Sequence, residues 1–247
     1  MIVISPAKRL AANKSDSLLE ATIPVFKKEA DHLAEQLAKL STQELSSMMK
    51  VSESIAELNA NRFRNWNKND AVEKRAIFQF EGDVFKHLGA NDLNEDQIQY
   101  MNNNLRILSG IYGLLKPSDE MNPYRLEMGT RHNFSGSVSL YEFWGNKIAK
   151  ELSDQLGDAY LFNLASEEYF SSVSKFLNSE KIINFRFLTL RNGKAKVVGV
   201  IAKRARGEMA KYLIQNKVTT NEGIEKFSAL GFEFKEFKDN CYTFISS

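Results

Sequence analysis

The sequence is poor in cysteine, histidine and proline, and these shortages exclude several classes of protein. Its 247 residues include one cysteine, three histidines and four prolines. The single cysteine, Cys241, excludes a disulfide framework and a zinc site built from cysteines. Three histidines leave little material for soft metal ligation, so we expect no metal and no cofactor.

The chain also lacks a long apolar run. No stretch approaches the roughly 18 uninterrupted apolar residues that indicate a membrane-spanning helix. The first apolar run ends after Ile4 and no basic segment precedes it, which does not fit a signal peptide. We therefore expect a soluble, cytoplasmic protein without a membrane partner.

The rest of the composition is that of an ordinary globular protein. Hydrophobic residues make up 43% of the chain and charged residues 26%, which argues against disorder. We find no repeat, low-complexity run or clean linker. We therefore expect one domain over residues 1–247, of mixed α/β (α+β-like) class.

Hydrophobic periodicity gives the outline of this domain. The N-terminal third is expected to be mostly helical, and Ser41-Thr42-Gln43-Glu44 has the pattern of a capping box that opens a helix. A further amphipathic helix is expected over 140–156, and the stretch 117–136 is expected to be an ordered loop. Short buried strands of a mixed sheet are expected at 2–4, 76–80, 106–108 and 160–165.

The clearest local pattern is a long β-hairpin. Residues 182–190 and 195–201 are both rich in apolar and β-branched side chains. Asn192-Gly193 between them is the signature of a type I′ turn. A helix is expected over 206–215, and a last pair of strands at 232–237 and 242–244.

The charge of the chain is unevenly distributed. The formal net charge is only +2, but residues 191–217 contain eight basic side chains and one acid, Glu208, which leaves −5 for the rest. This concentration indicates either an anionic partner or a solvated basic face.

Three of these basic residues, Lys203, Arg204 and Arg206, fall where the second hairpin strand is expected to give way to a helix. Basic side chains at a helix N-terminus oppose the helix dipole unless an anion also binds there. Together with free backbone N–H groups they would form a phosphate site. The alternative is that Arg204 or Arg206 pairs with an acidic loop.

Polar side chains also gather in three further places. Two of these lie just after expected strands, and the third lies on the expected loop at 117–136. In open sheets, ligands collect at the carboxyl ends of the strands. We therefore expect one shared cleft. The residues concerned are Lys8 after the first strand, Arg125, Glu127 and Arg131 on the loop, and Asn163, Ser166 and Glu168 at the end of the strand at 160–165.

Five ordered motifs resemble the YaaA family of bacterial peroxide-stress resistance proteins. The resemblance runs from Ile2 to the region of Phe232. The motifs are Ile4-Ser5-Pro6-Ala7-Lys8, Leu108-Ser109-Gly110-Ile111-Tyr112-Gly113, Pro123-Tyr124-Arg125-Leu126-Glu127-Met128-Gly129, Asn163-Leu164-Ala165-Ser166-Glu167-Glu168-Tyr169-Phe170 and Lys203-Arg204-Ala205-Arg206-Gly207.

The resemblance implies a positively charged cleft, a helix-hairpin-helix-like element and binding to duplex or distorted DNA. It also implies a role in iron homeostasis, by limiting iron-driven oxidative damage. On this basis the turn from Ser109 to Gly113 is the candidate hairpin. Where the family often has Thr-Leu-Asp after Ser-Pro-Ala-Lys, this chain has Arg9-Leu10-Ala11, so no acid is present at that position.

Two classes of function remain open. A DNA-binding protein would use its basic groups mainly on phosphates. The residues expected to bind DNA or another anion are Lys8, Ser109, Gly110, Gly113, Lys116, Arg125, Arg131, Asn163, Ser166, Lys203, Arg204 and Arg206. The alternative is an enzyme acting on nucleic acid or a nucleotide, with Lys8 or Lys203 as nucleophile and Glu168 or Glu127 moving protons.

Overall fold

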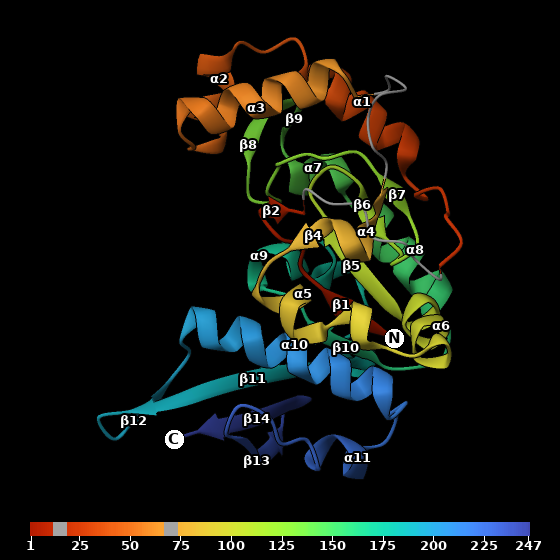
Figure 1. Ribbon diagram of the computed structural model, residues 1–247, viewed down its shortest axis with the longest axis vertical. Helices are drawn as coiled ribbons and strands as arrows, with labels where there is room; N and C mark the ends of the chain where they lie inside the picture. The colour runs from red at the N-terminus through yellow and green to blue at the C-terminus, as the bar shows by residue number, and fades with distance from the viewer. Residues whose placement is uncertain (12–18, 67–73) are drawn as a thin grey trace.

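The computed structural model describes residues 1–11, 19–66 and 74–247, and a mixed sheet runs through it (Figure 1). The order of its strands is β13-β14-β11-β10-β1-β5-β6, with β12 paired to β11. The strands β5, β1, β10, β11 and β14 are parallel, whereas β6, β12 and β13 pair antiparallel to their neighbours. The expected mixed α/β class is confirmed.

The first strand of the chain lies near the centre of this sheet. Ile2, Val3 and Ile4 are buried, and Ile4 lies between Ile107 and Leu164 of the two neighbouring strands. Because the three strands are parallel, the segments after them leave the sheet at the same edge. This arrangement brings distant parts of the sequence together.

The strands vary in length from two to ten residues. Their bounds are β1 Ile2–Ile4, β2 Arg9–Leu10, β3 Lys74–Arg75, β4 Phe80–Glu81, β5 Leu105–Ser109, β6 Gly113–Leu115, β7 Glu120–Met121, β8 Arg131–Phe134, β9 Ser137–Ser139, β10 Leu161–Leu164, β11 Ile182–Arg191, β12 Lys194–Lys196, β13 Phe232–Lys238 and β14 Cys241–Ser246. The last two strands form the expected C-terminal pair.

The first three helices, α1 to α3, lie at one end of the molecule, opposite β13 and β14 (Figure 1). Ser41 and Glu44 form the expected capping box at the start of the second helix. The bounds are α1 Lys27–Leu37, α2 Thr42–Met49, α3 Glu53–Arg64, α4 Ala76–Gln79, α5 Asp83–Leu88, α6 Glu95–Asn104, α7 Leu140–Trp144, α8 Lys147–Leu156, α9 Glu167–Phe170, α10 Gly199–Gln215 and α11 Asn221–Glu225.

Several expected elements differ from the structure. The stretch 117–136, expected to be a loop, contains the short strands β7 and β8. Residues 76–80 were expected to form a strand, but they form the short helix α4 and the first residue of β4. The backbone N–H groups of Ala76 and Ile77 donate to the carbonyl oxygens of Asp119 and Pro117, so a loop takes the place of a strand partner. The helix expected over 140–156 is interrupted at Gly145, which has a positive φ of 50°.

The hairpin is also shorter than expected. Its turn is confirmed, since Asn192 and Gly193 both have the positive φ of a type I′ turn. The second strand, expected over 195–201, ends at Lys196, and α10 begins at Gly199 instead of near 206. Helix is favoured because Ala202, Ala205 and later residues at helical spacing are buried against α5 and β11.

The expected helix-hairpin-helix element is not found at the Ser109–Gly113 turn. That turn joins two antiparallel strands, β5 and β6, with Ser109 paired to Gly113. Ser109, Gly110 and Gly113 are all buried. The assignment of this turn as a DNA-contacting hairpin was therefore wrong, because a glycine spacing does not tell whether a turn faces solvent or the core.

Candidate functional site

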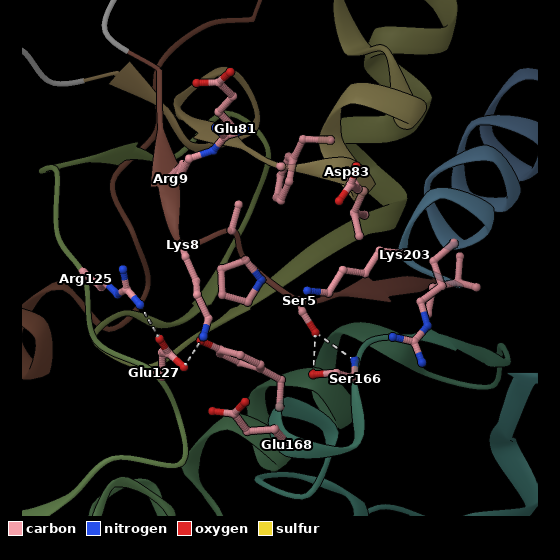
Figure 2. Close-up of a pocket in the computed structure, with 18 of the residues that line it drawn as sticks. Ser5, Lys8, Arg9, Glu81, Asp83, Arg125, Glu127, Ser166, Glu168 and Lys203 are labelled. Carbon is pink, nitrogen blue, oxygen red and sulfur yellow. Dashed lines mark hydrogen bonds and ion pairs between the residues drawn. The ribbon is translucent and has the colours of Figure 1, made fainter. Parts of the chain in front are cut away.

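A cavity of about 380 Å³ lies beyond the carboxyl ends of β1 and β10 (Figure 2). Its walls come from segments far apart in the sequence. They include the segment after β1, the start of α5, the loop at 124–127, the start of α9 and one face of α10. The expected shared cleft is thus present. Among the predicted residues, it brings together Lys8, Arg125, Glu127, Ser166, Glu168, Lys203 and Arg206.

Ser5 and Ser166 close the floor of the cavity between the two parallel strands. The amide N–H of Ser166 donates to Oγ of Ser5 at 2.8 Å, and the Ser5 hydroxyl donates to Oγ of Ser166 at 3.1 Å. Ser166 occupies the expected N-cap position of α9, but its side chain makes no cap hydrogen bond. The two strand ends are therefore tied to each other by their hydroxyl groups.

Glu127 holds two cations at one side of the cavity (Figure 2). Its Oε2 lies 2.9 Å from Nζ of Lys8, and its Oε1 lies 3.2 Å from Nη2 of Arg125. Nε of Arg125 is buried and has no hydrogen-bond partner among the residues that the structure describes. Because the Lys8 amine is already held in an ion pair with Glu127, this arrangement favours a binding role over nucleophilic attack by Lys8.

Glu168 ties the loop to the start of α9. Its Oε1 accepts the amide N–H of Gly129 at 2.9 Å, and its backbone carbonyl accepts the hydroxyl of Tyr141 at 2.8 Å. A side chain on Gly129 would come within 3.1 Å of the same carboxylate. Oε1 of Glu168 therefore positions the backbone of the loop, while the residue as a whole lines the cavity.

Lys203 and Arg206 form the cationic wall of the cavity. They lie three residues apart on α10 and so project from the same face of the helix. Within residues 1–11, 19–66 and 74–247, neither side chain has a hydrogen bond or an ion pair. Burial lowers the pKa of the half-buried Arg206 guanidinium. Such a pair is suited to an anion.

The helix N-terminus does not contribute to this anion site. Because α10 begins at Gly199, residues 202–208 lie inside the helix and their amides are used in its hydrogen bonds. The expected phosphate site at free N–H groups was therefore wrong. Arg204, which is not part of the cavity lining, has its Nε 3.5 Å from Oδ1 of Asp83, so the acidic-partner alternative holds for this residue.

Three predicted residues serve the core instead of the cavity. The Ser109 hydroxyl lies 2.6 Å from the hydroxyl of Tyr124 and accepts the amide N–H of Tyr112 at 2.9 Å. The carbonyl of Gly110 accepts Nε1–H of Trp144, and a side chain there would collide with the Leu126 carbonyl. Gly113 is likewise buried, so none of the three is placed to touch DNA.

The remaining predicted residues lie outside the cavity. Lys116 is exposed beyond β6. Arg131 lines a second hollow, which shares Glu127 and Glu168 with the cavity. Asn163 lies in a third hollow that shares Arg206 with the cavity, where its Nδ2 donates to Oδ1 of Asn184 at 2.9 Å.

The wall from α5 had no signal in the sequence. Asp83, Val84 and Phe85 line the cavity, yet they carry no motif, and only the packing of α5 against α10 places them there. Within the described part of the chain, His, Cys, Asp and Glu do not gather in a group of three that would hold a metal. The absence of a metal and a cofactor stays a prediction.

No helix in the described residues combines the length and the apolar character needed to cross a bilayer.

Comparison with known proteins agrees with the resemblance in the motifs. A family model described as "Peroxide stress protein YaaA" matches residues 1–238. The chain is 42% identical over 241 residues to a UPF0246 protein of Shewanella woodyi, covering 96% of this chain and 94% of that protein. It is 42% identical over 243 residues to one of Neisseria meningitidis, with the same coverage, and 39% identical over 246 residues to one of Clostridium botulinum, with 97% and 96% covered. The chain belongs to the YaaA family of peroxide stress proteins.

Proposed function

We propose that this chain acts in the peroxide-stress response by binding duplex or distorted DNA on the face that holds the cavity. Family membership supports the role in peroxide stress. The observation that carries DNA binding is the pair Lys203 and Arg206, two cations at the cavity without an acidic partner in the described residues. Phosphate groups are the partners that such a pair fits best.

The neighbouring hairpin supports the same conclusion. Residues 182–207 contain seven basic side chains and no acid. β12 and the end of β11 are exposed, and the hairpin that they form projects from the body beside the start of α10 (Figure 1). A projecting basic hairpin next to two unpaired cations offers a continuous track for a phosphate backbone, with little reading of base sequence.

DNA binding links the site to peroxide by a simple physical route. Peroxide and iron generate radicals that damage DNA, and protein bound along the backbone limits their access to it. On this account the protein acts by occupying DNA and needs no stored iron of its own.

A second candidate is an enzyme acting on nucleic acid or a nucleotide. The observation that favours it is the amine of Lys203, which lacks a carboxylate partner in the described residues and lies near another cation. An amine that is not held in an ion pair is available for nucleophilic attack. Reduction by borohydride of an imine formed with an aldehyde-bearing DNA would trap this lysine, and trapping that persists in Lys203→Ala would exclude it.

The test of DNA binding is a titration of labelled duplex, single-stranded and bubble DNA at several salt concentrations. The variant Lys203→Ala/Arg206→Ala is expected to bind much more weakly and to reduce the slope of log K against log salt by about 1.8, for two lost phosphate contacts. The control Lys39→Ala/Lys150→Ala removes the same charge from exposed sites on or beside α1 and α8. Equal weakening in both variants, or no binding by the wild type at low salt, would refute the proposal.

A further inference from the structure

We propose that the cavity is a binding site for a single nucleotide extruded from DNA, with its phosphate against Lys203 and Arg206 and its base edge toward Glu127 and Glu168. This inference rests on the proposed DNA binding and names the occupant of the site. Four features of the cavity support it: its size, the separation of its charges, its free acceptor atoms and its aromatic walls.

The size of the cavity excludes a duplex and suits a small molecule. At about 380 Å³ it falls within the range of about 300–1,000 Å³ for small-molecule sites. Duplex DNA, whose major groove alone is about 12 Å wide, cannot enter it. A protein that binds DNA on this face therefore fills the cavity only with something that has left the base stack, as proteins do when they extrude a nucleotide.

The cations of α10 and the two carboxylates lie on different sides of the cavity, with Glu127 shared between Lys8 and Arg125. Figure 2 shows the ammonium of Lys203 directed toward Ser5, on the side where Ser5 and Ser166 carry hydroxyl groups. Glu127 and Glu168 lie on the opposite side of the same view. A phosphate matches the first side, and hydrogen-bond donors on a base match the second.

The two carboxylates keep acceptor sites free. Each oxygen of Glu127 contacts one cation, and a carboxylate has about four lone-pair sites, so about two remain. Oε2 of Glu168 has no partner among the described residues. Carboxylates accept from the exocyclic amine of cytosine, so the site should prefer a base that carries an amine over thymine, which has none.

Apolar and aromatic side chains supply the walls. Tyr169 and Phe85 line the cavity and are themselves mostly buried, at 8% and 7% exposure. Pro6 faces the same space. Extruded bases are held by contact with such aromatic and apolar surfaces in addition to hydrogen bonds at their edges.

The experiment is calorimetric titration of the full chain with dCMP, dTMP, deoxycytidine and inorganic phosphate. We expect dCMP to bind about tenfold or more tightly than phosphate and more tightly than dTMP. Arg206→Ala should weaken dCMP binding by about tenfold to a hundredfold, the effect of losing a charged hydrogen bond. Lys211→Ala, which removes the same charge from the same helix outside the cavity lining, should leave binding unchanged.

Two further variants keep the result interpretable. Arg206→Lys retains the charge and should bind dCMP between wild type and Arg206→Ala, provided that its circular dichroism spectrum matches wild type. Glu168→Gln can still accept the amide of Gly129 and should narrow the preference for dCMP over dTMP. Equal affinity for dCMP and phosphate would mean an anion site only and would overturn the inference.

Failure here is distinguishable from failure of DNA binding. If DNA binds in a salt-dependent manner but no mononucleotide does, the cavity is not a nucleotide site and DNA binding stands. If neither binds, both proposals fall. If dCMP binds, bubble DNA should compete with it more strongly than a perfect duplex, and equal competition would contradict extrusion.

Discussion

Replacing Gly207 by alanine tests whether the wall of the cavity depends on the close approach of two helices. Gly207 lies on α10 where it packs against α5. A Cβ at this position would lie 2.4 Å from the carbonyl oxygen of Val84 and 2.7 Å from Cβ of His87. Favourable contacts begin at about 3.5 Å, so the helices must move apart by roughly 1 Å.

The net effect on stability is the sum of two opposing contributions. Alanine favours helix over glycine by about 0.8–1.0 kcal/mol, whereas overpacking of a filled interface costs about 1–3 kcal/mol. The upper half of that range applies because the closest atom belongs to the backbone of α5 and cannot rotate away. We therefore expect the free energy of unfolding of Gly207→Ala to fall by about 1–2 kcal/mol, with weaker DNA binding because Val84 and Phe85 shift.

Urea denaturation measures this change directly. The matched control is Gly199→Ala on the same helix, where an added Cβ meets nothing within 4 Å and should raise stability by about 0.4–1 kcal/mol. The reasoning is refuted if Gly207→Ala unfolds at the same urea concentration as wild type or at a higher one.

Four further substitutions distinguish residues that stabilise the fold from residues that bind. Glu127→Ala should reduce the free energy of unfolding by about 1–3 kcal/mol, since it removes the carboxylate that Arg125 contacts while Nε of Arg125 is buried. Lys8→Ala should change it by less than about 1 kcal/mol, since the ammonium is exposed. Thermal melts compare the two. Ser109→Ala should lower the free energy of unfolding by about 1–3 kcal/mol in the same melts and leave DNA affinity intact. Weaker DNA binding by a folded variant would mean that Ser109 contributes to the binding site. Burial raises the pKa of Asp119 above its ordinary 3.8, so the folded protein holds this proton more tightly than the unfolded chain does. The free energy of unfolding therefore falls as pH rises from 3.8 to the folded pKa. Asp119→Asn should flatten that part of the profile of stability against pH, and an unchanged profile would contradict the shift.

The gathering of the site was predictable because it depends on strand geometry. Ser5 and Ser166 come directly after buried strands, and parallel strands deliver the residues after them to one edge of the sheet. The capping box at Ser41 and the turn at Asn192 were predictable for a similar reason, since each is specified by residues a few positions apart.

The features that could not be predicted depend on contacts between distant segments. Residues 197–201 have the local pattern of a strand, but the chain leaves the sheet after Lys196, and residues 199–201 form the start of α10, which packs against α5. Gly110 looks like part of a loop that approaches nucleic acid, whereas its lack of a side chain accommodates the carbonyl of Leu126. Asp83 enters the cavity wall only through the position of α5, for which the sequence carries no motif.

The placement of β1 has a consequence for synthesis of the protein. This strand leaves the ribosome early, yet its two partners in the sheet begin only at Leu105 and Leu161. Until both have been made, its unpaired edges are open to pairing with other chains. Such long separations also slow folding. The cationic wall appears later still, at Lys203 and Arg206, so a nascent chain acquires its charged site only after the centre of its sheet can close.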